Sequence, residues 1–354
     1  MAEKSVTLAE VAEAAGVSVA TASRALNGSR DRKVREDLRL RVLDAAARLH
    51  YSPNTHAQAV ARGQASVVGL VVHDITDPYF SAIASGVIRT AEEHDLMVTL
   101  ATTYRSTQRE LEYVRMLRSQ RARSIVIVGS RFDDKKAHSQ LAEEVELYAA
   151  AGGRMALVSQ QHLPVDTVLV PNRTAARSLA AALHGLGHRR FAVLAGPSKL
   201  LTSTDRVNGF RQELDKLGCP VPAEGVHRAA FTRDGGYVAM SRALDEGFDA
   251  TCIFAVNDVM ALGAMAALRD RGIPLPDGMA VAGFDDIATL RDVTPPLTTV
   301  RLPMEEMGSD ALRMTLAEAH DKPRSIRVTG EVVLRESTPA LSEMRPLATG
   351  KPSR

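Results

Sequence analysis

Small, hydroxyl-bearing and guanidinium side chains form a compact group near the N-terminus. They are Val19, Ala20, Thr21, Ser23 and Arg24. Side chains of these types, at the start and on the outer face of a helix, suit insertion of that helix into the major groove of DNA. The alternative is a helical hairpin on the protein surface with no binding role.

Two short helices joined by a tight turn are expected to position this group. Thr7 and Glu10 have the spacing of a capping box, which satisfies backbone N–H groups at a helix start. Gly16 permits a sharp turn because it has no side chain, and Ser18 is suited to cap a second helix. Apolar residues at helical spacing are expected to face inward: Val11, Ala12, Ala15, Ala22, Ala25 and Leu26.

A third helix, Glu36–His50, is predicted because apolar residues recur along one side of it. The segment Tyr51–Asn54 contains a proline and ends this helix. Asn54 can then cap a helix of about two turns, Thr55–Ala61, which is too short to be stable alone in water. Residues 1–63 hold ten Lys or Arg and seven Asp or Glu. This small positive excess predicts a modest sequence-independent affinity for phosphates.

The composition is that of a globular protein with more than one domain. At 354 residues the chain exceeds the roughly 250–300 residues that one hydrophobic core usually organises. Cys219 and Cys252 fall in different predicted elements and are expected to be reduced structural thiols. No N-terminal signal peptide and no apolar run of the ~20 residues that span a bilayer are found. We therefore expect a cytoplasmic protein that does not contact membranes.

Beyond residue 66, short β-rich runs alternate with amphipathic helical segments. Near-continuous apolar strands separated by helices indicate parallel sheets covered on both faces, so an α/β fold of two lobes is expected. The expected strands include Val67–Val72, Met97–Ala101, Ile125–Val128, Met155–Val158, Val168–Val170, Phe191–Leu194, Thr251–Ala255 and Met279–Ala282. The expected helices include Gln108–Ser119, Thr174–His184, Asp205–Leu217, Gly235–Asp245 and Asp258–Arg271.

The motifs of common enzyme sites are missing from the sequence. It has no Gly-rich phosphate loop after a strand, no G-x-S-x-G nucleophile elbow and no His pair with metal-ligand spacing. The adjacent acids Asp285 and Asp286 could serve acid–base chemistry, but no companion nucleophile is identified. His184 and His188 lie beside a Gly-rich turn and are expected on the solvated surface. We therefore expect a protein that is not an enzyme and that needs no metal or cofactor.

From about residue 6 to residue 340, the sequence resembles the lactose/galactose repressor family of bacterial transcription regulators. Each matching motif is weak alone, but their order and intervals are specific. The densest match is Val6–Gly28, and the others are Tyr51–Asn54, Asp77–Phe80, Gly185–Arg190, Arg206 with Gly209 and Phe210, Phe231 with Gly236 and Tyr237, Asn257–Asp258 with Ala261–Gly263, Gly283–Asp286 and Pro296–Val300.

The resemblance implies four parts along the chain. Residues 1–53 would form a three-helix DNA-binding head with a helix-turn-helix, and residues 54–65 a hinge helix and linker. Residues 66–340 would form a two-lobed core, similar to periplasmic sugar-binding proteins, that binds an effector and dimerises. The chain would cross between the lobes three times, and residues 341–354 would be a flexible tail.

The resemblance also assigns DNA-contacting residues in the head. Val19 and Ala20 would occupy the first-turn positions that select bases, and they offer only apolar contacts. Arg24 would be the third such residue, and its guanidinium can bind guanine O6 and N7 together. Contacts to phosphate, together with the capping roles of the first two, are expected from Thr7, Ser18, Thr21, Ser23 and Asn27.

A hinge helix is implied between Asn54 and Ala61. In the family two such helices pair across the dimer, enter the minor groove and kink the operator. Ala57 matches the small residue of this helix, whereas Val60 stands where the wedge is usually leucine. Because valine is shorter and stiffer than leucine, we expect a shallower kink.

An effector site is implied between the lobes. Arg206 and Asp285 would face each other across the cleft and share the vicinal hydroxyls of a sugar, one donating and the other accepting. The alternative for this pair is a structural salt bridge, and for the aromatic residues it is a place in a lobe core. The full expected set is Tyr79, Phe80, Thr202, Arg206, Phe231, Asn257 and Asp285.

These expectations combine into a homodimeric regulator, a repressor of carbohydrate genes that binds a pseudo-palindromic operator and a sugar-type effector. Ser159 and Gln160 replace an Asp–Arg pair that is common in the family, so no particular sugar is named. A regulator with a purine-like corepressor is the closest alternative. A sugar-binding transport protein or a sugar-modifying enzyme is a more distant one.

Overall fold

The computed structural model describes residues 6–27, 34–51, 66–318, 320 and 322–342. The chain forms two compact units, residues 1–65 and 66–354. Within the described residues, no helix has the length and apolar character required to cross a bilayer.

The first unit is a head of three helices, α1 (Leu8–Ala15), α2 (Val19–Asn27) and α3 (Glu36–Arg48). The third helix ends two residues earlier than predicted. The predicted inward residues of α1 and α2 form its core together with α3, although Leu26 is only half-buried. The core residues are Val11, Ala12, Ala15, Ala22, Ala25, Val42, Ala45 and Ala46.

The turn between α1 and α2 depends on Gly16. Its φ of 63° lies in the left-handed region, which side chains rarely tolerate. Nη2 of Arg41, on α3, donates to the carbonyl of Ala15 at 2.5 Å. A Cβ on Gly16 would lie 2.7 Å from that nitrogen, so a side chain here would displace the Arg41 guanidinium from the carbonyl of Ala15.

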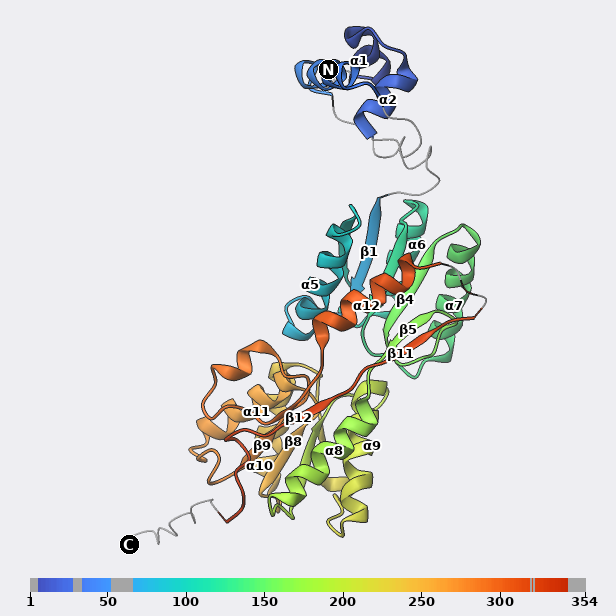
Figure 1. Ribbon diagram of the computed structural model, residues 1–354. Helices are drawn as coiled ribbons and strands as arrows, with labels where there is room; N and C mark the ends of the chain where they lie inside the picture. Colours follow the sequence, from blue (N-terminus) through green and yellow to red (C-terminus); the bar gives the residue numbers. More distant parts are fainter. Residues whose placement is uncertain (1–5, 28–33, 52–65, 319, 321, 343–354) are drawn as a thin grey trace, which may run out of the picture. The chain divides into compact units, whose positions relative to one another are not determined.

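The second unit consists of two lobes, each with a parallel sheet between helices (Figure 1). The sheet of the N-terminal lobe has the order β11-β5-β4-β3-β1-β2. The elements of this lobe are β1 (Val67–Val72), α5 (Pro78–Glu92), β2 (Met97–Thr102), α6 (Thr107–Ser119), β3 (Ser124–Val128), α7 (Lys135–Ala150), β4 (Arg154–Ser159), β5 (Asp166–Leu169), α12 (Met304–Leu316) and β11 (Ser325–Arg327).

The C-terminal lobe has a four-stranded sheet of order β7-β6-β8-β9 and a two-stranded antiparallel sheet of β10 and β12. Its elements are α8 (Asn172–Gly185), β6 (Phe191–Ala195), α9 (Leu201–Lys216), η1 (Ala223–Gly225), β7 (Val226–Arg228), α10 (Arg233–Glu246), β8 (Cys252–Ala255), α11 (Asp258–Asp270), β9 (Ala280–Ala282), η2 (Ala288–Arg291), β10 (Thr299–Arg301) and β12 (Glu331–Val333).

Three segments connect the lobes, as expected: β5 to α8, β10 to α12, and β11 to β12. Helix α12 therefore packs in the N-terminal lobe, next to α5, although it follows the C-terminal lobe in sequence (Figure 1). The two helices approach closely at Gly86, where a Cβ would lie 1.9 Å from the carbonyl oxygen of Glu305.

Two sequence expectations fail in the core. His188 is not a surface residue: it is fully buried, and its Nε2 donates to the carbonyl of Pro339 at 3.1 Å. Strand β2 is not covered on both faces, because it is the edge strand of its sheet and Met97 and Leu100 are 66% and 42% exposed. Both cysteines are unpaired, as expected.

Candidate nucleic-acid interface and effector cleft

The start of α2 presents the predicted base-reading residues to solvent. Oγ of Ser18 accepts from the backbone N–H of Thr21 at 3.1 Å, so Ser18 caps the helix as predicted. Val19 is 50% exposed, and Ala20 is exposed beside it. Because its side chain is exposed, Val19 is not needed to pack the core of the head. It is therefore available for the predicted apolar contact to a base.

Arg24 lies on the same helix one turn further on. Its Nε donates to the carbonyl of Ala20 at 3.0 Å, which holds the side chain along the helix. Thr21 and Ser23 are half-buried beside it, and Asn27 is the last residue of α2. The hydrogen bond to Ala20 uses only Nε. Both Nη groups therefore remain at the tip of the side chain, where together they can donate to O6 and N7 of a guanine.

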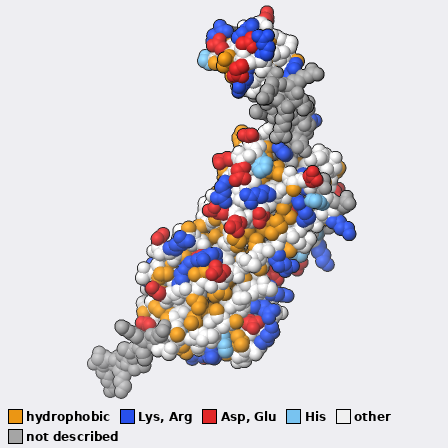
Figure 2. Space-filling model, viewed as in Figure 1, with side chains coloured by type: hydrophobic (Ala, Val, Ile, Leu, Met, Phe, Trp, Pro, Cys, Tyr) orange, Lys and Arg blue, Asp and Glu red, His pale blue; other side chains and the backbone are white. Residues whose placement is uncertain are grey.

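Thr7 acts as the predicted cap of α1. Its Oγ1 accepts from Glu10 N at 3.3 Å, and its own backbone N–H donates to the Glu10 carboxylate at 2.6 Å. Figure 2 shows blue and red side chains interspersed over the visible face of the head. The predicted hinge residues Asn54, Ala57 and Val60 lie outside the described residues, as does most of the predicted tail.

A cavity between the two lobes, here called the inner cavity, has a volume of about 30 Å³. All seven predicted effector residues line it: Tyr79, Phe80, Thr202, Arg206, Phe231, Asn257 and Asp285. This volume holds about one water molecule. A larger ligand therefore requires the lobes to separate or a lining side chain to withdraw.

Arg206 and Asp285 contact each other directly. Nη2 of Arg206 donates to Oδ1 of Asp285 at 2.8 Å, and both side chains are almost fully buried. They do not face each other from opposite lobes as expected, because Arg206 belongs to α9 and Asp285 follows β9, both in the C-terminal lobe. The expectation was wrong because the resemblance placed Arg206 and Asp285 at the cleft without showing which lobe contributes each residue.

The surroundings of Arg206 fix its guanidinium. Nε donates to Asn172 Oδ1 at 2.9 Å and Nη1 to the carbonyl of Val256 at 2.8 Å. The guanidinium also lies over the ring of Phe284, with Cζ 3.8 Å from the ring centroid. A guanidinium has five N–H donors, and these bonds use three. Two therefore remain for ligand hydroxyls.

Asp285 is strained as well as buried. Its φ is 122°, and that of Asp286 is 58°. Burial raises the pKa of Asp285, and the neighbouring Arg206 opposes this rise because it favours the charged carboxylate. Such strained, desolvated carboxylates are typical of functional sites.

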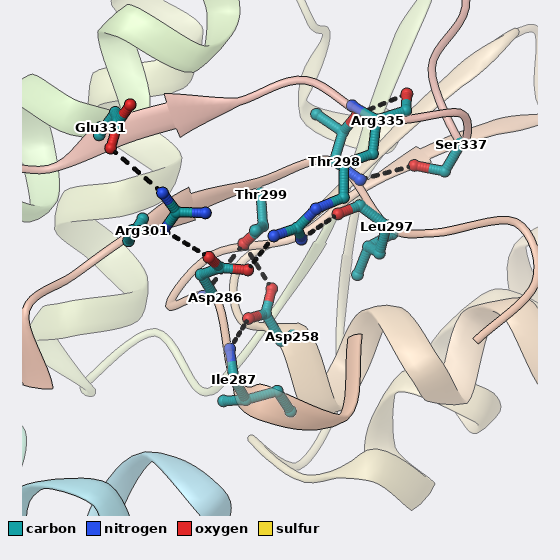
Figure 3. A network of polar contacts seen from close by, with 10 residues as sticks. All are labelled: Asp258, Asp286, Ile287, Leu297, Thr298, Thr299, Arg301, Glu331, Arg335 and Ser337. Carbon is teal, nitrogen blue, oxygen red and sulfur yellow. Dashed lines mark hydrogen bonds and ion pairs between the residues drawn. The ribbon is translucent and has the colours of Figure 1, made fainter. Parts of the chain in front are cut away.

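The carboxylate of Asp286 holds this strained turn in place (Figure 3). Its Oδ2 accepts from Arg301 Nε at 2.7 Å, and its Oδ1 accepts from Arg335 Nη2 at 2.6 Å. Asp258 extends the network, because its carboxylate accepts from Thr299 Oγ1 at 2.7 Å. The network therefore ties the cleft residue Asp285 to β10, the strand that leads into a connection between the lobes.

The remaining predicted residues supply two polar groups, from Thr202 and Asn257, and three rings. Oδ1 of Asn257 caps α11 through Met260 N at 3.1 Å, so the amide nitrogen is the group that it can offer to a ligand. Tyr79 and Phe231 are half-buried at the cavity wall. Phe80 is only 4% exposed and lies within the core of the N-terminal lobe, as its alternative reading predicted, while still lining the cavity.

Two contacts cross the cleft. Sequence reasoning missed Arg105, whereas Gln160 is one of the two positions at which the sequence departs from the family's common Asp–Arg pair. Arg105 Nη2 donates to the carbonyl of Phe231 at 3.1 Å, and its Cζ lies 5.6 Å from the Phe231 ring centroid. Nε2 of Gln160 donates to Thr202 Oγ1 at 2.9 Å. Gln160 follows β4 directly, and Arg105 lies three residues after the end of β2. Position at the carboxyl end of a parallel strand is the signal that could have identified Arg105.

His73 is a further cavity residue that was not predicted. It follows β1, lines the inner cavity, and its Nε2 donates to the carbonyl of Ser130 at 3.1 Å. Burial lowers its pKa to about 4, so the ring is uncharged at neutral pH. Among the described residues, no group of three or more His, Cys, Asp or Glu side chains is arranged to hold a metal ion.

Two family models match the chain. The model described as bacterial regulatory proteins, lacI family, matches residues 7–54, which include all three helices of the head. The model described as periplasmic binding protein-like domain matches residues 180–338, which include most of the C-terminal lobe together with α12 and β11 of the N-terminal lobe.

Full-length relatives agree with both models. The transcriptional repressor CytR of Escherichia coli K12 is 32% identical over 344 residues, which cover 96% of this chain and 98% of the relative. The lac repressor dimer bound to operator and the anti-inducer ONPF is 25% identical, covers 95% of this chain and all of its own, and superposes with a TM-score of 0.80. The transcriptional regulator CelR in complex with cellobiose is 29% identical, with coverages of 94% and 99% and a TM-score of 0.68.

Proposed function

Because the chain belongs to the LacI family of bacterial regulatory proteins, we propose that it is a homodimeric, cytoplasmic repressor controlled by a sugar or sugar derivative. It is a DNA-binding transcriptional regulator and not an enzyme, in agreement with the functions named for its relatives. The operator is a pseudo-palindrome, because two identical heads related by a two-fold axis read two half-sites.

The observation that supports a sugar effector best is the pairing of Arg206 with Asp285. The guanidinium retains two donors and the carboxylate retains Oδ2 as an acceptor, which is the combination that adjacent hydroxyls require. Phe231 and Tyr79 flank this pair and offer apolar faces for a pyranose or furanose ring. The cavity therefore combines directed polar groups with an apolar wall, as small-molecule sites do.

Effector binding regulates DNA affinity through the spacing of the lobes. The inner cavity is too small for a sugar ring, so an effector has to displace the contact of Arg105 with Phe231 or that of Gln160 with Thr202. Both contacts join the two lobes. An effector that replaces them shifts the equilibrium between lobe arrangements only to the extent that it binds one arrangement better.

The surface around β2 is the proposed dimer interface of the N-terminal lobe. Met97, Leu100 and Ile88 are exposed there, and they surround a hollow of about 570 Å³ between β2 and α5. An open sheet edge beside a cluster of exposed apolar side chains marks an association surface. We infer that the occupant is a second copy of the chain, because the lac repressor that the fold resembles is a dimer.

The function is tested by selecting binding sites from random duplex DNA with the full-length protein. We expect a pseudo-palindromic sequence to be enriched, and its affinity to change at least tenfold with one sugar from a panel. The panel also contains purines, and a response to a purine alone would establish the alternative effector class. Failure to enrich any sequence would contradict the proposed regulator.

Arg24→Ala is expected to weaken operator binding by about 5- to 150-fold, because a bidentate contact to guanine contributes about 1–3 kcal/mol. Fluorescence anisotropy with the selected operator measures this loss. Arg24→Lys is the matched control, since it keeps the positive charge and removes the fork of two donors. Equal affinity of both variants and the wild type would show that Arg24 does not read a base.

A further inference from the structure

A second cavity lies in the N-terminal lobe next to the cleft and is here called the outer cavity. Its volume of about 390 Å³ is within the range of small-molecule sites, about 300–1,000 Å³. It is bounded by the segments that follow β2, β3 and β4 and by the first turns of α6 and α7. These segments lie at the carboxyl ends of parallel strands, where open α/β sheets bind their ligands.

The outer cavity adjoins the inner cavity. His73, Arg105 and Ser130 line both of them. Leu200 and Leu201, from the C-terminal lobe, line the inner and the outer cavity respectively. The outer cavity is therefore an extension of the effector cleft, and Arg105 stands at the boundary between the two.

A buried ion pair forms part of the outer cavity wall. Nη1 and Nη2 of Arg131 donate to the two carboxylate oxygens of Glu110 at 2.6 and 2.5 Å, and both residues are more than nine-tenths buried. Because this pairing is bidentate, the charge of Arg131 is neutralised within the protein. Nε of Arg131 has no hydrogen-bond partner in the described structure, although it is buried.

The remaining charges of the lining also balance. Arg105 and Lys135 are accompanied by Asp133 and Asp134. Burial and two positively charged neighbours, His138 when protonated and Arg131, lower the pKa of His162, so it adds little positive charge. A lining of balanced charge disfavours a phosphate or another anion, because each anionic oxygen would meet a carboxylate as often as a cation.

The lining instead suits a neutral ligand with many hydroxyls. Ser106, Thr107 and Ser139 supply hydroxyl groups. Phe132 and Leu141 add an apolar surface in the same cavity. This combination of donors, acceptors and one aromatic ring resembles the chemistry of the inner cavity.

We propose that the effector occupies both cavities and contains at least two linked hydroxylated units, as an oligosaccharide or a glycoside does. The first unit contacts Arg206 and Asp285, and the second lies between Phe132 and the start of α7. Entry into both cavities at once requires Arg105 to leave the carbonyl of Phe231. The proposal rests on the proposed function, because it extends the same effector site.

Isothermal titration calorimetry of the full-length protein tests this extension with matched sugars. The probes are glucose against cellobiose and maltose, and galactose against lactose and melibiose. We expect one disaccharide to bind about tenfold or more tightly than its monosaccharide, because the second unit adds several hydrogen bonds of about 0.5–1.5 kcal/mol each.

Two substitutions locate the second unit. Phe132→Ala and His138→Ala change side chains that line the outer cavity, whereas Gln140→Ala changes an exposed residue of α7 outside the lining. The first two are expected to reduce disaccharide affinity several-fold and to leave monosaccharide affinity within a factor of two. Gln140→Ala should change neither.

Three other results of these titrations would contradict the proposal, and each would contradict a different part of it. Equal affinity for monosaccharide and disaccharide, unaffected by the two substitutions, would refute the outer subsite and leave the sugar-responsive repressor intact. A sugar phosphate that binds more tightly than every neutral disaccharide would refute the argument from charge balance. If no sugar of either length binds, both the subsite and the proposed effector class are wrong.

Discussion

Arg206→Ala is expected to abolish effector binding and to lower the free energy of unfolding of the core by about 3–5 kcal/mol, the usual cost of removing one partner of a buried ion pair. The substitution removes the donors that a ligand needs. It also leaves Asp285 buried beside an empty position and releases the oxygen of Asn172. Operator binding itself should persist, because the head is a separate compact unit.

The destabilisation by Arg206→Ala should grow with pH. Burial raises the pKa of Asp285, and Arg206 counteracts this rise in the wild type. A raised pKa means that the folded protein holds the proton more tightly than the unfolded chain, so the contribution of this group is lost as pH rises through the folded pKa. Without Arg206 the pKa rises further, and ionisation becomes more costly. Urea denaturation at pH 6 and pH 9 measures the difference.

Two further variants show whether the loss comes from the pair. Arg206→Ala combined with Asp285→Ala should be less destabilised than Arg206→Ala, because no carboxyl group then remains buried alone. Gln212→Ala, at an exposed position of the same helix, should leave stability and effector response unchanged. An Arg206→Ala protein that binds effector with wild-type affinity would show that the ligand site is elsewhere.

Local features of the sequence predicted the head well. Thr7 and Glu10 are three residues apart, so their mutual bonds depend only on the helix that they begin. The same holds for Ser18 and Thr21. The caps and the inward-facing apolar residues of these helices follow from helical geometry alone. They could therefore be predicted without information about the rest of the chain.

The errors in the core concern residues whose partners are distant in sequence. His188 is buried by a segment that contains Pro339, 151 residues later. Arg105 contacts Phe231, 126 residues later and in the other lobe. The resemblance brought Arg206 and Asp285 to the same cleft, but their direct contact depends on how α9 packs beside the strand β9.

Strand β2 shows a different limit of sequence reasoning. Four of the six residues from Met97 to Thr102 are apolar, so the sequence groups this run with apolar strands such as β1 that are expected to be covered on both faces. Exposure follows from the strand order, which places β2 at the sheet edge. An apolar strand at an uncovered sheet edge is expected in a protein whose second copy covers that edge.

The double substitution Met97→Asp with Leu100→Asp is expected to convert the dimer into monomers and to reduce operator affinity by about 10²–10⁴-fold. Two-fold symmetry introduces each carboxylate twice into one interface, where burial without a partner is costly. Both side chains are exposed in the single chain, so the fold itself should tolerate the change. The affinity falls because the second head no longer binds as part of the same molecule, which removes the gain from effective concentration.

Sedimentation velocity and operator anisotropy measure the two effects on the same sample. Met116→Asp is the matched control, since Met116 is 53% exposed on α6 and does not line the hollow beside β2. Effector binding by the monomer should be retained, because both cavities are lined by one chain. A dimer that survives the double substitution would place the interface on another face. A monomer with undiminished operator affinity would show that the two heads act independently, and would contradict the paired reading of a pseudo-palindrome.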